Sequence, residues 1–429
     1  MLAILTTHPI QYQVPLWQAL ARDTDVPFEV WYLTKHATEE SRDREFEKSF
    51  AWDLDMLSGY PYRFLDVDPG ATPNNFWKCR VRESLAERIR ERNVKALWIQ
   101  GWQVAAYWQA VWAARKLGIE VWLRGESNDL APTPIWKRAI KRAILGQLFR
   151  RVDRFLYIGT ANRRLYQKFG VADDRLYPAP YAVDNERFQH QAEALRNSKS
   201  AIRNQWHIPE DAFCVLFCGK FIPKKRPLDL VKAAQLLITN PPTDGFASPR
   251  PVRPVADVAN IHLLFVGSGE LGAELRANCN VVFDAESAQT PINQQRITDN
   301  RKPAASFAGF LNQTEISRAY VTADCLVLPS DYGETWGLVV NEAMASGLPC
   351  IISDRCGCAE DLGSLGTNQT FDCRNRLKLA QKIAHVALDQ KRPLSFGMLP
   401  SLENTVATAV SLYRREFSCQ APPDPDDVR

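Results

Sequence analysis

In the stretch Asp331-Tyr-Gly-Glu334-Thr-Trp336-Gly337-Leu338-Val-Val-Asn-Glu342-Ala-Met-Ala-Ser-Gly347, two glutamates lie on either side of a predicted junction between a loop and a helix. The apolar run just upstream, Cys325–Leu328, predicts a buried parallel strand, so the loop leaves the carboxyl end of that strand. Open α/β sheets bind their ligands at this end. A helix is predicted over 336–346, and its first N–H groups favour phosphate oxygens. The stretch therefore predicts an α/β fold with a phosphate site.

The spacing of the two glutamates suits a nucleotide sugar. Glu334 precedes the helix and Glu342 lies on its second turn, roughly 10 Å away at a rise of about 1.5 Å per residue. One carboxylate could hold ribose hydroxyls while the other faces a sugar ring, with a diphosphate between them. The alternative is an ordinary amphipathic helix that leaves both glutamates in solvent and buries one apolar stripe, Leu338, Val339, Ala343 and Met344. The glutamates alone favour this alternative, and the neighbouring motifs reverse the preference.

Three motifs extend the pattern along the chain. The first comprises Pro329, Ser330, Glu334, Gly337, Glu342, Ala343, Met344, Ala345, Gly347 and Pro349. The second is Gly219-Lys220-Phe221-Ile222-Pro223-Lys224-Lys225, and the third is Tyr181-Ala182-Val183-Asp184-Asn185-Glu186-Arg187-Phe188. Together they resemble the motifs of retaining glycosyltransferases of family 4, also known as glycosyltransferase group 1, over most of the chain. The chain departs from the family pattern at Trp336 (usually Phe), at Lys220 (usually Arg) and at Tyr181-Ala182 (usually Asn-Gly).

The resemblance implies an α/β GT-B fold, in which two Rossmann-like, doubly wound domains face a central cleft. It assigns the donor to the C-terminal domain, at Gly219, Lys220, Lys225, Glu334, Trp336, Gly337, Leu338 and Glu342. Lys220 and Lys225 would neutralise the diphosphate, both in the bound donor and as the leaving group gains charge. Glu334 would face the transferred sugar, Glu342 would bind ribose, and the N–H groups of Gly337 and Leu338 would meet the phosphates. The alternative for the lysines is a pair of surface side chains beside a turn, and Lys220 lacks the bidentate contact of an arginine.

The N-terminal half is expected to bind the acceptor, and here the chain departs from its relatives. Many of them have a Gly-Gly loop after the first strand, whereas this chain has His8, Gln11 and Tyr12 there, which become acceptor-side candidates. For His8, a hydrogen-bonded position at a strand end explains the residue equally well. Glu126 follows a later strand, where relatives often carry a histidine, and is a candidate base or orienting group for the acceptor hydroxyl. The expected catalytic residues are therefore Glu334, Lys220, Lys225 and Glu126.

No metal or other cofactor is expected, because lysines and a helix N-terminus supply the positive charge and no Asp-x-Asp motif stands at a predicted strand end. A glycosidase also uses two carboxylates, but it holds no diphosphate and needs no such lysine pair. The resemblance implies that the anomeric configuration is retained by a front-face reaction without a protein nucleophile.

A competing motif is Gly267-Ser-Gly269-Glu-Leu-Gly272, which directly follows the predicted strand Ile261–Val266 and precedes Asp284. Its spacing matches a dinucleotide-binding fingerprint and would make the chain an NAD(P)-dependent oxidoreductase. However, the motif follows an internal strand of the second half, and family 4 carries Val-Gly-x-Gly here as a turn beside the donor site. We therefore rank the oxidoreductase interpretation below the glycosyltransferase.

Length and patterning predict two domains. A chain of 429 residues exceeds what one core usually supports, and strands alternate with helices in two successive sets. The expected division is an acceptor domain 1–187, a nucleotide-sugar domain 188–401, a helix 402–418 that returns toward the N-terminal domain, and a disordered tail 419–429, with a hinge near 184–205. Two polar segments, 240–254 and 285–304, are expected to be inserted loops. The predicted strands are Leu2–Thr6, Phe28–Leu33, Ala96–Ile99, Glu120–Arg124, Arg154–Ile158, Cys214–Cys218, Ile261–Val266, Cys325–Leu328 and Pro349–Ser353.

A basic amphipathic helix is predicted over 136–151. It could lie on an anionic membrane as a peripheral contact, which would suit a lipid-linked acceptor. We favour a helix packed on its own domain, with Ile140, Ile144 and Leu148 buried and the lysines in solvent.

The remaining features favour a cytoplasmic protein, peripheral on the inner face of the membrane at most. Residues 1–9 predict a buried strand and not a signal peptide, and no segment is apolar for long enough to cross a bilayer. The cysteines are scattered, as expected for reduced thiols. A net charge of +4 is too small to indicate nucleic acid.

The sequence thus predicts a retaining glycosyltransferase that moves a sugar from a nucleotide-diphosphate sugar to a glycan, lipid-linked or small-molecule acceptor, in the synthesis of cell-surface polysaccharide or glycoconjugate. The alternative is a non-catalytic GT-B module that binds a nucleotide or glycan, in which Lys220 and Tyr181-Ala182 mark lost activity.

Overall fold

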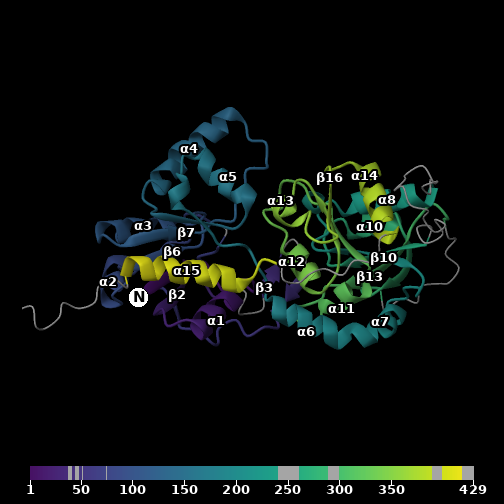
Figure 1. The fold of residues 1–429 in the computed structure, drawn as a ribbon, viewed down its shortest axis with the longest axis horizontal. Coiled ribbons are helices and arrows are strands. Elements are labelled where there is room, and N and C mark those ends of the chain that lie inside the picture. The colour runs from purple at the N-terminus through teal and green to yellow at the C-terminus, as the bar shows by residue number, and fades with distance from the viewer. Residues whose placement is uncertain are drawn as a thin grey trace, which may run out of the picture. The chain divides into compact units, whose positions relative to one another are not determined.

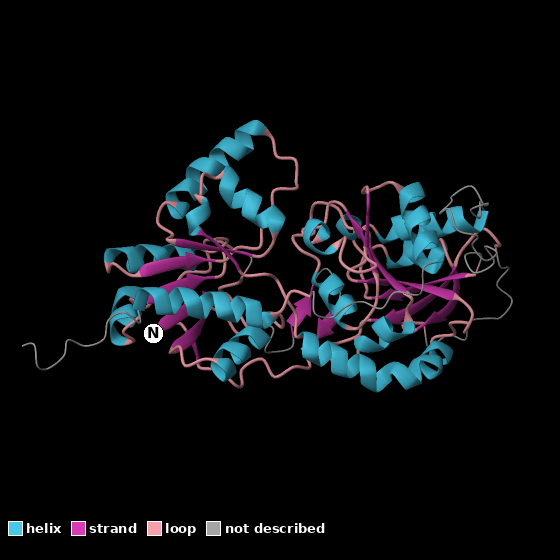
Figure 2. Cartoon of the chain, viewed as in Figure 1, coloured by secondary structure: helices cyan, strands magenta, loops and turns pink. Residues whose placement is uncertain are grey.

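The computed structural model describes residues 1–36, 41–43, 48–50, 52–73, 75–239, 260–287, 299–388 and 399–417, with the backbone alone described at 41–43 and 48–50. It divides into two units (Figure 1). The first unit comprises Met1–Ser41, Asp55–Ala182 and Pro400–Arg429, and the second comprises Arg42–Leu54 and Val183–Leu399. Within each unit, helices pack around the strands of a sheet (Figure 2). The expected inserted loop 240–254, most of 285–304 and the tail 419–429 lie outside the described residues.

The first unit is built on a parallel sheet in the order β5-β2-β1-β6-β7-β8-β9. The sequence order reverses between β1 and β6, so these two strands flank a topological switch point, where α/β sheets bind ligands. The strands are β1 (Leu2–Thr6), β2 (Phe28–Tyr32), β5 (Tyr62–Phe64), β6 (Ala96–Ile99), β7 (Glu120–Leu123), β8 (Arg154–Tyr157) and β9 (Leu176–Pro178). The helices are α1 (Val14–Asp23), α2 (Leu85–Glu91), α3 (Ala105–Lys116), α4 (Ile135–Phe149), α5 (Thr160–Lys168), the short η1 (Asp173–Arg175) and α15 (Leu402–Phe417).

The second unit repeats the architecture with the order β12-β13-β11-β10-β14-β15-β16, again all parallel. Here the switch point lies between β10 and β14. The strands are β10 (Phe213–Cys218), β11 (Ile261–Val266), β12 (Asn280–Asp284), β13 (Ala304–Gly309), β14 (Cys325–Leu328), β15 (Cys350–Ser353) and β16 (Gln369–Phe371), and a separate small sheet pairs β3 (Ser41–Asp43) with β4 (Lys48–Phe50). The helices are α6 (Asn185–Leu195), η2 (Arg196–Ser198), α7 (Lys199–Gln205), η3 (Pro223–Lys225), α8 (Pro227–Thr239), α10 (Gly272–Ala277), α11 (Ser317–Thr322), α12 (Leu338–Ala345), α13 (Ala359–Leu362) and α14 (Arg376–Leu388).

The inner strands of each sheet are buried on both faces. Every residue of β1 and of β11 is buried, which is why these strands are continuous apolar runs in the sequence and not alternating patterns. In the first unit, α3, α4 and α5 share one apolar cluster with the sheet, while α15 packs against α1. In the second, α8, α10 and α14 contribute to the corresponding cluster. The two cores are separate clusters, as expected for two domains.

The division of the chain differs from the expected one. The first long segment ends at Ala182 and not at 187. The residues expected to form a hinge are mostly helical, because α6 and α7 pack on α11 within the second unit. The segment Arg42–Leu54 also joins the second unit, where the carboxylate of Asp53 accepts the backbone N–H groups of Gln313 and Thr314, each at 3.1 Å. No sequence pattern predicts this assignment.

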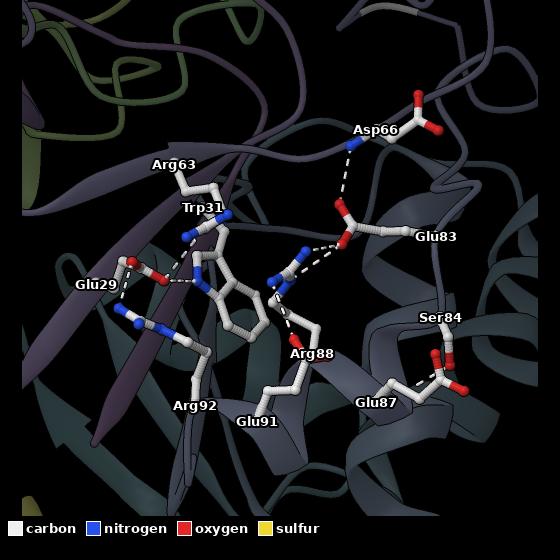
Figure 3. Close-up of polar contacts among 10 residues, drawn as sticks. All are labelled: Glu29, Trp31, Arg63, Asp66, Glu83, Ser84, Glu87, Arg88, Glu91 and Arg92. Atoms are coloured by element: carbon white, nitrogen blue, oxygen red, sulfur yellow. Dashed lines mark hydrogen bonds and ion pairs between the residues drawn. The ribbon is translucent and has the colours of Figure 1, made fainter.

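A buried carboxylate on β2 is held by its neighbours within the first unit (Figure 3). Glu29 accepts the indole N–H of Trp31 at 2.7 Å and Arg92 at 2.6 Å, and Arg63 lies 3.9 Å away. Close by, the hydroxyl of Ser84 caps the first turn of α2. Since a buried charge needs such partners, the cluster is explained by the stability of the fold.

Candidate active site

The switch point of the second sheet brings two loops together. β10 and β14 pair directly, so the loops that follow them start side by side. The loop after β10 carries Lys220 and Lys225, and the loop after β14 carries Glu334 and leads into α12. The loops also meet further on, because the N–H of Asp331 donates to the carbonyl of Lys224 at 2.9 Å. Two of the sequence motifs are thus joined at the carboxyl end of one sheet.

An ion pair links these loops. The ammonium of Lys225 lies within hydrogen-bonding distance of the carboxylate of Glu334, and the hydroxyl of Ser330 donates to the same oxygen at 3.3 Å. The side chains of Lys225 and Glu334 are 21% and 12% exposed. The residues assigned to the phosphate and to the sugar therefore lie together, partly shielded from water.

Opposing effects act on the pKa of Lys225. Burial lowers it, whereas the charge and the hydrogen bond of Glu334 raise it, and the pKa ends above the usual range of a lysine. Lys225 is therefore a cation at neutral pH. An arriving anion would meet an ammonium that is already positioned, where Coulomb interactions are stronger than in bulk water.

Two glycines shape the start of the loop after β10. Gly219 has a φ of 147°, and a Cβ added to it would meet no atom of the described residues within 4 Å. Gly267 packs on the carbonyl of Gly219, since a Cβ there would come to 2.1 Å from that oxygen. A ligand can therefore approach the backbone at Gly219 closely. Lys220, half-buried, follows directly.

Glu342 lies on α12 and is only 3% exposed. Its carboxylate accepts hydrogen bonds from the phenol of Tyr320 on α11 and from the amide of Gln313 at 3.4 Å. Burial and the nearby Glu342 carboxylate raise the pKa of the Cys218 thiol, at the end of β10, to about 12. The alternative in which both glutamates are solvated is therefore wrong. No motif indicates Tyr320 or Gln313, which sequence reasoning missed.

The other three donor candidates surround the start of α12. The indole of Trp336 is buried and donates to the side chain of Asn341 at 2.8 Å, so it belongs to the interior of the second unit. Gly337 caps α12 with a φ of 108°, and a Cβ there would lie 2.6 Å from Leu328. Leu338 begins α12, and the first N–H groups of a helix lack acceptors within the helix.

In the first unit, the acceptor-side candidates His8, Gln11 and Tyr12 follow β1 in the chain. Nδ1 of His8 lies 2.9 Å from the hydroxyl of Thr7, and its ring meets that of His36 edge-on with centroids 5.2 Å apart. Burial and the charge of His36 lower the pKa of His8 to about 4, so His8 is neutral at pH 7. Gln11 is buried and Tyr12 half-buried, shortly before α1. His8 is therefore a hydrogen-bonded histidine just after the end of β1.

Glu126 follows β7 and lies in a cluster with Arg124 and with Tyr181, the first residue of the third motif. The phenol of Tyr181 donates to Glu126 at 2.7 Å. The guanidinium of Arg124 lies over the ring of Tyr181 at 4.7 Å and 4.0 Å from the Glu126 carboxylate. Arg124 and Tyr181 are buried, whereas the side chain of Glu126 is 38% exposed. Burial and the charge of Glu126 raise the pKa of Tyr181, which therefore remains a protonated donor.

The dinucleotide-like motif has a structural explanation. Gly267 packs on Gly219, and the N–H of Phe221 donates to the carbonyl of Ser268 at 2.8 Å. The helix that follows, α10, has six residues. The carboxylate of Asp284, which would hold a ribose, is instead bound by Arg276 at 2.6 and 3.0 Å. The motif thus supports the loop after β10.

The basic helix α4 is less buried than the sequence analysis predicts. Of the three residues expected to be buried, only Leu148 is buried, while Ile140 and Ile144 are exposed. The expectation is wrong because only the last turns of α4, with Leu145 and Phe149, reach the apolar cluster of the first unit. Across the described ranges, no helix has both the length and the apolar character needed to span a membrane.

Comparison with known proteins finds a family model that matches part of the chain. Residues 198–398 match the family model described as glycosyl transferases group 1. A D-inositol 3-phosphate glycosyltransferase from Thermomonospora curvata is 26% identical over 189 residues, which are 44% of this chain and 38% of the relative. The match thus spans less than half the length of this curated relative.

Two solved structures resemble nearly the whole chain. A glycosyltransferase from Rickettsia africae has a TM-score of 0.60 at 13% identity, covering 96% of this chain and 98% of that one. Anabaena HepE, solved in complex with UDP-glucose, has a TM-score of 0.56 at 13% identity, with coverage of 96% and 98%. At this identity the likeness shows the fold alone, and it confirms the GT-B class with its two α/β units.

Proposed function

We propose, from the match of residues 198–398 to the glycosyl transferases group 1, that the protein is a retaining glycosyltransferase of family 4. It would transfer a sugar from a nucleotide-diphosphate sugar to a glycan, lipid-linked or small-molecule acceptor, in the synthesis of cell-surface polysaccharide or glycoconjugate. The observation that carries the proposal is the ion pair of Lys225, in the loop after β10, with Glu334, in the loop that leads from β14 into α12. The donor class is also that of HepE, solved with UDP-glucose.

We assign the donor diphosphate to the region between Lys225 and the first turn of α12. Lys225 supplies a partly desolvated positive charge, and a helix N-terminus favours phosphate oxygens. Gly219 lets the backbone come close to the phosphates, and Lys220 adds a second cation. Glu342 would bind ribose hydroxyls, because a carboxylate has about four acceptor positions and its two described donors fix its orientation.

Donor binding would change the Lys225–Glu334 pair. A phosphate oxygen that reaches the ammonium competes with Glu334, so the carboxylate shares Lys225 or turns toward the sugar. As the bond from the anomeric carbon to the phosphate oxygen breaks, negative charge grows on the leaving diphosphate, and Lys225 stabilises this state more than the ground state. Glu334 would in turn stabilise the positive charge that develops on the sugar.

The first unit would supply the acceptor side. The acceptor hydroxyl would attack from the face that the diphosphate leaves, which retains the anomeric configuration, and its proton would pass to Glu126. Tyr181 supports this role, because its hydrogen bond fixes one carboxylate oxygen of Glu126. His8, as a neutral imidazole, would accept a hydrogen bond from the acceptor, beside Gln11 and Tyr12.

We further propose that the reaction needs no metal ion, since Lys220, Lys225 and the N-terminus of α12 supply positive charge where the diphosphate would lie. We also place the enzyme in the cytoplasm, in keeping with the unpaired state of the cysteines in the described part of the chain.

Thermal shift measurements with UDP-, GDP- and ADP-sugars test the donor assignment first. One nucleotide class should raise the melting temperature, and Glu342→Ala should weaken its binding by about 1–3 kcal/mol through lost hydrogen bonds to ribose. Glu315→Ala, which removes an exposed glutamate from the loop before α11, is the matched control.

Turnover of the bound donor then separates the alternatives. Release of nucleotide diphosphate with transfer to an acceptor supports the enzyme. Binding of the donor without turnover would instead support the non-catalytic module, and stabilisation by NAD(H) but by no sugar nucleotide would support the oxidoreductase.

A further inference from the structure

The first ten residues of α4 stand in solvent on every side. All residues from 135 to 144 are exposed, and only Leu145, Leu148 and Phe149 anchor the helix in the core of the first unit. Figure 1 shows α4 reaching away from the strands of this unit. Among the exposed residues, Ile135 and Trp136 are 76% and 62% exposed, and Ile140 and Ile144 are 53% and 54% exposed.

These exposed side chains separate into two sides of the helix. Residues three and four positions apart share a helix face, so one side carries Trp136, Ala139, Ile140, Ala143 and Ile144. The other side carries four cations, Lys137, Arg138, Lys141 and Arg142. No acidic residue occurs between Ile135 and Arg151. The helix is therefore apolar on one side and uniformly basic on the other, and its own domain covers neither side.

From this arrangement we propose that α4 is a docking surface for an anionic lipid membrane. The apolar side enters the boundary between headgroups and acyl chains, with Trp136 at the level of the headgroups, where its amphipathic ring is favoured. The four cations face the phosphates of anionic lipids. The helix is already folded, so binding does not have to overcome the entropy of forming it.

The charge pattern selects the membrane over other partners. Nucleic acid would engage the cations and leave Trp136, Ile140 and Ile144 in water. A second copy of the chain, joined through the same helices, would bring two basic sides close together without an acid on either helix, which like-charge repulsion disfavours. A lipid surface satisfies both sides of α4 at once.

The proposal goes beyond the transfer reaction and does not rest on it. It concerns a surface whose residues take no part in the proposed donor and acceptor sites, and its test measures vesicle binding and not activity.

Co-sedimentation of the full chain with vesicles tests the surface. Vesicles of phosphatidylcholine with phosphatidylglycerol should bind the protein, vesicles of phosphatidylcholine alone should bind it weakly, and added salt should weaken binding to the former. A variant with Trp136→Ser, Ile140→Asn and Ile144→Asn should lose about tenfold or more in partitioning, since each buried apolar side chain contributes to insertion. A variant with Lys137→Gln, Arg138→Gln, Lys141→Gln and Arg142→Gln should lose the preference for phosphatidylglycerol.

The matched control combines Trp77→Ser with Leu377→Ser, which removes side chains that are 74% and 58% exposed elsewhere on the molecule. It should bind vesicles like the natural chain. Melting curves of all variants show whether each is folded before binding is compared.

Several outcomes would overturn the proposal. The first is that the protein does not bind anionic vesicles. The second is that the control variant loses as much vesicle binding as the apolar variant, and the third is that the apolar variant still binds vesicles like the natural chain. Salt-sensitive binding to duplex DNA without vesicle binding would make α4 a nucleic-acid surface. Self-association that the apolar variant abolishes and vesicles do not displace would make its occupant a second copy.

Discussion

Glu334 in the second unit and Glu126 in the first are two carboxylates held in different ways. The carboxylate of Glu334 forms an ion pair with the ammonium of Lys225. The carboxylate of Glu126 accepts a hydrogen bond from the neutral phenol of Tyr181, and its side chain is the more exposed of the two. A lysine already paired with one anion can exchange it for another, as when a phosphate arrives. A carboxylate oriented by a neutral donor is suited to take a proton from a hydroxyl. The difference supports assigning the donor to the second unit and the acceptor to the first.

Lys225→Ala is expected to have the largest effect, because it removes a partly buried cation and takes the ammonium away from Glu334. Turnover should fall about 10²- to 10³-fold, and donor affinity should fall less, since the leaving group is most charged in the transition state. Steady-state kinetics and titration with the nucleotide diphosphate separate the two constants. Lys224→Ala, which removes an exposed lysine from the same turn, is the control. Equal losses in the two variants would remove Lys225 from the leaving-group site.

Glu126→Gln tests the other half of the contrast, because it keeps the shape of the side chain and removes the carboxylate. Transfer to the acceptor should fall about 10²-fold while titration with the nucleotide stays near the natural value. Tyr181→Phe deletes one hydrogen bond to the same carboxylate and should lower transfer about tenfold. Loss of nucleotide binding in Glu126→Gln would contradict the assignment of donor and acceptor to different units.

The two units also each contain a histidine whose pKa is lowered to about 4, His8 in the first and His262 in the second. His262 is buried with Nε2 2.8 Å from the hydroxyl of Ser306, and burial followed by the charge of Arg203 lowers its pKa from 6.5. Between about pH 6.5 and pH 4 the unfolded chain binds a proton that the folded chain does not, so the free energy of unfolding falls as the pH falls. For His262 the loss should approach about 3 kcal/mol at the acid end.

Urea unfolding at a series of pH values measures this loss. His262→Gln should flatten the dependence by up to about 1.4 kcal/mol per pH unit within the window. His190→Gln, at an exposed position of α6, is the control variant. Because His8 contributes to the same window, a reduced slope is expected to remain, but a slope as steep as that of the natural chain would mean that His262 is not excluded from protonation in the folded state.

Chelation of metal ions is expected to have no effect on activity. Activity should survive EDTA, because lysines and a helix N-terminus would stabilise the leaving diphosphate. Complete loss of activity that Mg²⁺ or Mn²⁺ restores would contradict the proposed role of Lys220 and Lys225.

Much of the fold can be predicted because the inner strands of both sheets are buried on both faces. Predicted strands such as Leu2–Thr6 and Ile261–Val266 coincide with β1 and β11, since such strands are continuous apolar runs. The edge strands β5, β9 and β16 have three residues each and carry no comparable signal. The exposure of Ile140 and Ile144 is likewise not predictable, because periodicity shows which residues share a face and not whether that face has a partner.

The candidate site is also predictable only in part. Lys225 and Glu334 belong to motifs, and the structure brings them together, whereas Tyr320 has no motif and reaches Glu342 only through the packing of α11. The departures at Glu126 and Tyr181 look independent in the sequence, 55 positions apart, yet a hydrogen bond joins them. Glu126 and Tyr181 therefore support each other. The bond depends on how β7 and β9 end, which no local pattern encodes.

The assignment of Arg42–Leu54 to the second unit has a consequence for how such an enzyme diversifies. The chain passes from the first unit to the second after Ser41, returns at Asp55, crosses again after Ala182 and returns at Pro400, so neither unit is inherited as one segment. A single recombination between relatives near residue 182 would exchange the acceptor side and also replace Asp53. The backbone of Gln313, whose side chain contacts Glu342, would then lose the carboxylate that holds it. An exchange of the first 182 residues alone would therefore also change the support of Gln313, which contacts Glu342 of the proposed donor site.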